Sequence, residues 1–344
     1  MTFYSILSGA LFKNTTPNAS GDSRTSMETS GLRQTVIGFK GERELQPNLT
    51  AFFNLESHFD TNDGFLHGTG DAPRGGTNNT PLFRRQANLG VRGDWGSVTV
   101  GRQYGPALLA HIGTEPRAFK EQFSNLYAWA YGQLFTTFNP NNGSGRNTNN
   151  DVGIFMNNAV QYRNTWGPVT MGVLYSFGGQ AGDFKDNSAY ALGLTYNGPI
   201  TLSGSYQAFH DEQSGKKVVD HTSLGFAIPF GDFTWKNNWM NAKNDNTAGN
   251  QLFDVNGFGT GLDWKWSAKN SATLAFYLNK DDANKSDETK FIVISNDYQW
   301  RPDTTLYIQA AFADADPGAT LRTSIVAAGV TAGEKSTLLN VGLN

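Results

Sequence analysis

Histidine, carboxylate and cysteine side chains most often carry catalysis or metal binding, and this chain offers few useful arrangements of them. It has 344 residues, no cysteine and five histidines. The histidines are His58, His67, His111, His210 and His221. No spacing among them makes a metal motif. Glu56 and His58 are two residues apart, so they share one face of any strand that contains them. Ordinary lining of a wet surface explains this pair better than acid–base chemistry, so we expect no enzyme, no cofactor and no metal.

Most of the chain consists of short segments in which polar and apolar residues alternate. In Thr304–Phe312, one face carries Leu306, Ile308 and Phe312, whereas Gln309 lies on the other face. Successive side chains of a β-strand point to opposite sides, so this alternation predicts strands with one apolar and one polar face. Further clear examples are Val169–Phe177, Ile200–Phe209 and Ala272–Asn279.

The lengths of the connections between these segments also alternate. Short turns are predicted at Glu44–Asn48, Asp94–Ser97, Thr165–Pro168, Asn197–Pro199, Pro229–Asp232, Ser267–Asn270 and Arg301–Asp303. Longer polar connections are predicted at Asn14–Gly31, Thr61–Pro81, Tyr104–Asn157, Gly178–Asn187, Asp211–Lys217, Asn244–Val255, Asp281–Thr289 and Ala313–Lys335. Outer-membrane barrels have short periplasmic turns and long extracellular loops. We therefore predict an all-β fold, a sixteen-stranded antiparallel transmembrane β-barrel that forms a single domain over residues 1–344.

The longest connection, Tyr104–Asn157, interrupts the alternating pattern and is rich in aromatic residues. Five apolar residues in it have roughly helical spacing, namely Leu108, Phe119, Phe123, Leu126 and Trp129. Long connections without strands are usually functional or disordered. Because these aromatic side chains need something to pack against, we predict that residues 104–157 fold into the lumen and narrow it. The alternative is a surface loop.

Composition limits the class of protein further. Aromatic residues make up 13% of the chain, glycines number 39 and the net charge is -3. No apolar run approaches the ~18 residues of a transmembrane helix, and a nucleic-acid-binding protein would normally be strongly basic. Aromatic residues beside the short turns fit one membrane interface; they are Trp95, Trp166, Phe230, Trp266 and Trp300. We expect the cell outer membrane, with the signal peptide already removed from this chain.

Three stretches now show a family resemblance. Thr50–Phe59 (TAFFNLESHF), Phe83–Tyr104 (FRRQANLGVRGDWGSVTVGRQY) and Asn158–Gly179 (NAVQYRNTWGPVTMGVLYSFGG) resemble the general diffusion porins of β-proteobacteria. Phe3–Leu11 and Ser336–Leu343 resemble the opening and closing strands of that family. The resemblance implies a homotrimeric outer-membrane porin of a Gram-negative bacterium, whose third loop folds inward.

Three departures from the family pattern bear on selectivity and length. Family members commonly have an arginine where this chain has Val36, and some anion-selective members have another where it has Gln86. The resemblance therefore implies weak anion preference or near-neutrality. The family usually ends on an aromatic residue, whereas this chain stops at Asn344, so we expect the last few residues of the protein to be missing from this chain.

Selectivity in a pore depends on the charges at its narrowest section. Alternation places Lys40, Glu56 and Arg84 on the interior face. It places Arg102 on the lipid face, but a bulge at Gly101 could re-aim that side chain. The family's matching arginine, in GRQY, belongs to the constriction, so the resemblance assigns Arg102 there. The complete set of predicted constriction residues is Lys40, Glu56, Arg84, Arg102, Glu115, Arg117, Lys120 and Glu121.

The function that we predict is passive diffusion of ions and small hydrophilic solutes through a water-filled outer-membrane channel. Its expected partners are two further copies of the chain, outer-membrane lipid and lipopolysaccharide, and no nucleic acid. One alternative is a substrate-preferring channel of the same fold, with a stacking track made by Phe119, Tyr127, Trp129 and Tyr131. The other alternative is a soluble β-rich adhesin or binding module.

Overall fold

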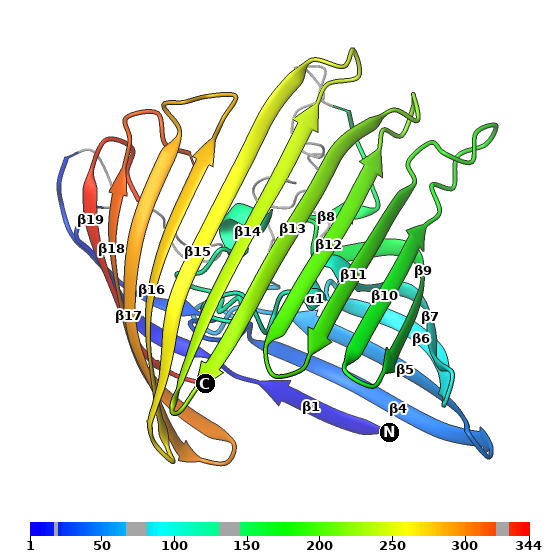
Figure 1. Ribbon diagram of the computed structural model, residues 1–344, viewed down its shortest axis with the longest axis horizontal. Coiled ribbons are helices and arrows are strands. Elements are labelled where there is room, and N and C mark those ends of the chain that lie inside the picture. The colour runs from blue at the N-terminus through cyan, green and yellow to red at the C-terminus, as the bar shows by residue number, and fades with distance from the viewer. Residues whose placement is uncertain (17–19, 67–80, 131–144, 321–329) are drawn as a thin grey trace.

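The computed structural model describes residues 1–16, 20–66, 81–130, 145–320 and 330–344. It is all-β and antiparallel, with one long segment lying inside the curved sheet (Figure 1). The strands before that segment are β1 (Thr2–Ile6), β2 (Gly9–Asn14), β3 (Arg24–Thr29), β4 (Val36–Gln46), β5 (Leu49–His58), β6 (Gln86–Gly93) and β7 (Gly96–Tyr104). The segment contains α1 (Pro106–Ala110) and the two-residue β8 (Asn150–Asp151). The strands after it are β9 (Phe155–Trp166), β10 (Val169–Ser176), β11 (Ala189–Asn197), β12 (Thr201–His210), β13 (Lys217–Phe230), β14 (Phe233–Asp245), β15 (Gln251–Ser267), β16 (Asn270–Asp281), β17 (Glu288–Arg301), β18 (Thr304–Ala315) and β19 (Lys335–Leu343).

The strands pair as a ladder that follows the chain. Pairing runs from β4 to β7, from β7 to β9, and then through successive strands to β19. The last strand, β19, pairs with β2, which pairs with β3, while β1 pairs with β4. Between these pieces, Ser8 and Thr35 bond to each other: the Thr35 hydroxyl donates to the Ser8 carbonyl at 3.0 Å and accepts from the Ser8 N–H at 3.1 Å. The segment that contains β1 and β2 therefore lies antiparallel beside the segment that contains β3 and β4.

The two faces of the sheet differ in polarity as the alternating pattern predicts. On β18, Leu306 is 40% exposed and Ile308 is 55% exposed, whereas Gln309, the residue after Ile308, is 0% exposed. Apolar residues on the outside and polar residues on the inside are the reverse of a water-soluble sandwich. The predicted aromatic residues at the short turns, Trp166 and Trp300 among them, are also about half exposed on the outside, at 49% and 50%.

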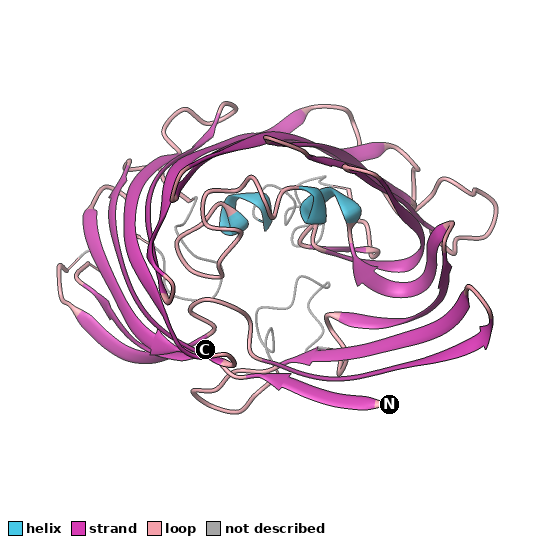
Figure 2. Ribbon diagram, turned by 60° about the horizontal axis from the view of Figure 1, so that its bottom comes forward, coloured by secondary structure: helices cyan, strands magenta, loops and turns pink. Residues whose placement is uncertain are grey.

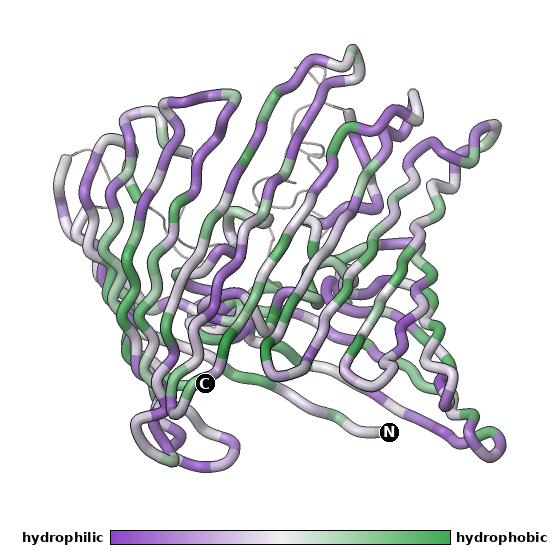
Figure 3. The backbone as a smooth tube through the Cα atoms, viewed as in Figure 1, coloured by the Kyte–Doolittle hydropathy of each residue, from purple (hydrophilic) through white to green (hydrophobic). Residues whose placement is uncertain are grey.

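The predicted alternation of short and long connections is confirmed. Neighbouring strands are joined by turns of two or three residues at one end, such as 94–95 between β6 and β7 and 231–232 between β13 and β14. These turns and both chain ends lie at the bottom of Figure 1, and the long, mostly hydrophilic connections lie at the top (Figures 1 and 3). Within the described residues, no helix has the length and apolar character needed to cross a membrane.

The segment between β7 and β9 leaves and re-enters the sheet between two paired strands. Val100 of β7 lies opposite Val160 of β9, so β7 and β9 are neighbours in the sheet and the segment between them is a long insertion that connects two paired strands. Seen along the interior, residues 105–130 lie against the inner face of the sheet (Figure 2). Among the described residues of this segment, only α1 and residues 126–130 are helical, which is less than the apolar spacing suggests, because residues 111–125 form turns that contact the wall.

Candidate functional site

The inner segment begins on a strip of wall that carries no side chains. Gly172 of β10 and Gly193 of β11 lie opposite each other in the sheet. A Cβ atom on Gly193 would come within 2.0 Å of the Pro106 carbonyl oxygen, and one on Gly172 within 2.6 Å of Pro106 Cβ. Pro106 is the first residue of α1, a position where the missing proline N–H costs little. Glycine pairing in the wall thus lets α1 lie directly on the sheet.

The segment then crosses β12 and β13 on small hydroxyl residues. The His111 ring contacts Ser205 through Nε2 at 2.9 Å and Ser203 through Nδ1 at 2.7 Å. The Thr114 hydroxyl lies 2.6 Å from that of Ser203, and a Cβ on Gly225 would meet Thr114 Oγ1 at 2.4 Å. Burial lowers the pKa of His111 to about 4, so this ring is neutral and acts as a hydrogen-bonding group.

Glu115 ties the segment into a compact turn and fastens it to the wall. Its Oε2 accepts the N–H groups of Arg117 and Phe119, each at 2.7 Å. Its Oε1 accepts the Asn125 N–H at 3.2 Å and the Tyr277 hydroxyl of β16 at 2.8 Å. The carboxylate is 0% exposed, and four donors satisfy it, as burial of a charge requires.

Two basic side chains of the segment reach the next strands of the wall. The buried Arg117 guanidinium donates to the Ser295 hydroxyl of β17 at 3.2 Å and to the Gln309 side-chain oxygen of β18. Lys120 Nζ forms an ion pair with Asp297 Oδ2 of β17 at 2.6 Å. These contacts fix the middle of the segment to the inner face of β17 and β18.

The far end of the turn reaches the first strands of the chain. The Glu121 N–H donates to the Leu32 carbonyl at 3.3 Å, and Gln34 Nε2 donates to Glu121 Oε2 at 3.1 Å. Gln122 accepts from Asn340 of β19 at 2.7 Å. Burial raises the pKa of Glu121 to about 7, although neighbouring arginines oppose the rise. Glu121 is therefore partly protonated at neutral pH and contributes less than a full negative charge.

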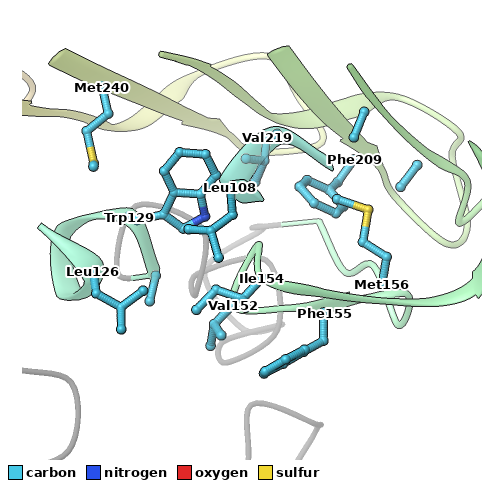
Figure 4. Packing of buried hydrophobic residues seen from close by; sticks show 14 of the residues in the cluster. Leu108, Leu126, Trp129, Val152, Ile154, Phe155, Met156, Phe209, Val219 and Met240 are labelled. Atoms are coloured by element: carbon cyan, nitrogen blue, oxygen red, sulfur yellow. The ribbon is translucent and has the colours of Figure 1, made fainter. Parts of the chain in front are cut away.

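An apolar cluster between the segment and the wall contains Trp129, the largest fully buried side chain among the described residues (Figure 4). Its indole N–H donates to the Gly153 carbonyl at 3.1 Å, and Phe119 meets it edge-on with ring centroids 5.9 Å apart. Phe119, Tyr127 and Trp129 are 8%, 7% and 0% exposed. These three aromatic residues pack the segment against the wall and are not available as a stacking track for a solute. Tyr131, the fourth predicted member, lies outside the described residues.

Arg102 and Arg84 meet at Asp151, where the segment returns to the sheet. Gly101 has φ of 111°, and the register of β7 with β9 shifts between Gly101 and Gln103, so the bulge considered from the sequence is present. Arg102 is turned inward and donates to Asp151 Oδ2, while Arg84 donates to both Asp151 oxygens at 3.1 and 3.3 Å. Although burial raises the pKa of Asp151, the two guanidiniums hold it well below its usual range.

Arg85, which the sequence pattern did not single out, is paired with a predicted residue. Its Nε donates to Glu56 Oε1 at 2.5 Å, and the Tyr4 hydroxyl donates to Glu56 Oε2 at 2.6 Å. Lys40 is exposed, with Nζ 5.4 Å from the centre of the Tyr4 ring. Glu56 is therefore a buried acceptor for Tyr4 and Arg85, and Lys40 remains open to water beside them.

A cavity of about 1220 Å³ lies between the segment and the rest of the wall. Of the eight predicted constriction residues, only Lys120 and Glu121 line it; Glu115 and Arg117 are buried behind it. Its other charged lining residues are Arg33, Arg85, Lys265, Lys269, Asp297 and Asp303. The sequence did not predict Arg33 and Arg85 as lining residues, because both lie in irregular segments, 30–35 and 82–85, where alternation gives no side-chain direction. Among the described residues, no three or more His, Cys, Asp or Glu side chains group together to hold a metal ion.

The chain is similar to known proteins over most of its length. A family model described as Gram-negative porin matches residues 1–318. The chain is 25% identical over 249 residues to outer membrane porin protein 32 of Delftia acidovorans, a match that spans 62% of this chain and 66% of that protein.

Solved structures show the same fold. The anion-selective porin from Comamonas acidovorans superposes with a TM-score of 0.81 at 22% identity, over 99% of this chain and 98% of that one. A trimer form of OmpT from Vibrio cholerae superposes with a TM-score of 0.62 at 12% identity, over 100% of this chain and 99% of that one. At these identities the structural likeness concerns the fold alone.

Proposed function

Because this chain belongs to the Gram-negative porin family of outer-membrane channel proteins, we propose that ions and small hydrophilic solutes cross it by passive diffusion. The observation that carries the proposal is the inverted sheet, with exposed apolar side chains outside and a cavity of about 1220 Å³ with charged lining residues inside. Large barrels of this kind hold an aqueous channel. Passive diffusion needs no bound cofactor and no chemical step. Planar-bilayer recording tests it: stepwise, voltage-linear current supports a channel, and a silent membrane containing the folded protein contradicts it.

We propose that the sheet is a closed barrel of sixteen strands that forms one domain over residues 1–344. Joining β1 to β2 and β3 to β4, and setting aside the two-residue β8, leaves sixteen. Bacterial outer-membrane barrels have an even number of strands. The Ser8–Thr35 hydrogen bonds would complete the wall between the first two strands. Within this barrel, residues 104–157 would form the constriction loop.

Charges around the narrow section should give a mild preference for anions. Lys120 and Glu121 would act directly from the loop, since they line the cavity, whereas Lys40, Arg84 and Arg102 would act from the wall without lining it. The basic residues that line the cavity outnumber the acidic ones, and partial protonation of Glu121 adds to the imbalance. The charge of Glu56, however, is paired with that of Arg85. Glu115 and Arg117 are buried, so we assign both to anchoring the loop. The printed description of the Comamonas acidovorans porin as anion-selective agrees with this direction.

Replacing Arg102 with alanine should shift the reversal potential in a salt gradient toward cations. Arg102 compensates Asp151, so its loss leaves a less balanced negative charge. A unit charge about 5 Å from a passing ion changes the energy of that ion by about 0.8 kcal/mol in water. After screening by salt, we expect roughly a twofold change in the anion-to-cation permeability ratio.

Two variants control this experiment. Arg102→Lys keeps the charge and should keep most of the selectivity. Arg92→Ala removes a positive charge at another place on the wall. Arg102 of β7 pairs with Ala87 of β6, and Arg92 lies five residues beyond Ala87 on β6, so the two arginine positions are about 17 Å apart. That distance exceeds the screening length of about 8–10 Å, so Arg92→Ala should have little effect. Equal shifts for Arg92→Ala and Arg102→Ala would contradict a role for Arg102 at the narrow section.

We propose that the assembly is a homotrimer whose inner contact includes β1, β2 and β19. Apolar residues project from the outside of these strands, and Phe3, Leu11 and Val341 are 58%, 67% and 52% exposed. A shallow outer hollow of about 590 Å³ is lined by Leu11, Met27, Ile308 and Val341 among others. Packing rather than water exclusion would hold such a contact in lipid. Unheated electrophoresis in mild detergent should give a band three times the monomer mass; monomer alone would count against the trimer.

A further inference from the structure

The inner segment presents the apolar Leu109 and Ile112 to the cavity, in addition to the charged Lys120 and Glu121. His111 and Thr114 both point to the wall, where they contact Ser203. Ile112 lies between them and therefore points away from the wall. It is 44% exposed although the segment lies inside the sheet, and it lines the cavity together with Leu109. The acidic Glu115 is unavailable because its four hydrogen bonds bury it.

Two arginines, Arg33 and Arg85, line the same cavity. Arg33 lies between Leu32 and Gln34, whose backbone and side chain both contact Glu121 of the segment, and Arg33 itself is exposed. Arg85 is oriented by Glu56, and its guanidinium lies 5.3 Å from the centre of the Tyr104 ring. The Arg85 guanidinium also donates to the Tyr104 hydroxyl, so two contacts fix its orientation at the cavity wall.

We propose that Leu109 and Ile112, with Arg33 and Arg85, form a weak subsite for organic anions that carry an apolar body, such as aromatic carboxylates. This inference rests on the proposed channel function and names the solute class that the narrow section favours. The guanidiniums bind the carboxylate, and Ile112 covers part of the ring. Removing about 30 Å² of apolar surface from water favours occupancy about threefold, enough to slow passage without trapping the solute.

The test compares anions that differ in apolar character. Single-channel chloride current is recorded while benzoate, acetate or gluconate is added at equal concentration. Benzoate should reduce the chloride current with an apparent dissociation constant about threefold lower than that of acetate. Gluconate, which is bulky but hydrophilic, should resemble acetate, and this comparison separates apolar contact from size.

Ile112→Asn should abolish the difference between benzoate and acetate, since asparagine has similar bulk but no apolar contact, whereas Ile112→Leu should keep it. Arg33→Gln should weaken the block by both benzoate and acetate. Equal block by benzoate and acetate in the unsubstituted protein, or a difference that survives Ile112→Asn, would overturn the subsite and leave the channel itself intact. Absence of any chloride current would instead refute the channel function on which the subsite depends.

Discussion

Deleting residues 115–128 should raise the single-channel conductance at least about twofold, because conductance is set by the narrowest part of a pore. The deleted residues include most contacts that hold the inner segment across β14 to β19, such as those of Arg117 with Ser295 and of Gln122 with Asn340. The wall left behind carries polar groups such as Ser295 and Asn340, together with an apolar patch that Phe123 covers and that includes Phe12 and Phe291. Because the paired strands β4 to β19 lie outside residues 115–128, the barrel should still insert and conduct.

A matched control shortens the connection at Asn246–Asn250, which lies in a turn at the long-loop end between β14 and β15. That change should leave conductance unaltered, because the turn is far from the inner segment. If removal of residues 115–128 also leaves conductance unaltered while the protein still inserts, the segment does not narrow the pore.

Replacing Glu115 with alanine should release the loop from its fixed position without shortening it. Four donors would lose their acceptor: the N–H groups of Arg117, Phe119 and Asn125, and the Tyr277 hydroxyl. A hydrogen bond to a charged group contributes about 1.5–3 kcal/mol, so the loss exceeds about 3 kcal/mol even when water restores part of it. We expect the single-channel current to fluctuate between several levels, measured as excess open-channel noise.

Tyr277→Phe provides the graded comparison, since it removes only one of the four hydrogen bonds. Its noise should lie between that of the unsubstituted protein and that of Glu115→Ala. A quiet, single-level current in Glu115→Ala would show that the carboxylate does not hold the loop, and the buried position of Glu115 would then need another explanation.

Much of the fold could be predicted because strand structure leaves a period of two in the sequence. On β18 the apolar Leu306 and Ile308 are outside and Gln309 is inside, as that period requires. The Gly101 bulge could also be anticipated, because glycine tolerates the positive φ that turns Arg102 inward. Alternation worked wherever the backbone is a regular strand.

The candidate site was harder to predict because its residues lie where the backbone is irregular. Arg84 pairs with Asp151 and Arg85 with Glu56, but both arginines precede β6, so parity could not separate them. The loop acids Glu115 and Glu121 read as exposed charges in the sequence. Their partners, Tyr277 and Gln34, are 162 and 87 residues away in the chain, and no local sequence pattern predicts contacts over such separations.

The most direct test of a conducting lumen narrowed by the inner segment is chemical modification of one introduced thiol. The chain has no cysteine, so Ile112→Cys provides a single reactive site on the exposed face of the segment. A negatively charged methanethiosulfonate reagent should lower the single-channel current in irreversible steps, whereas labelling of Ala248→Cys in an outer connection should leave it unchanged. Complete labelling of Ile112→Cys with no change in current would place the segment outside the conduction path and contradict the account.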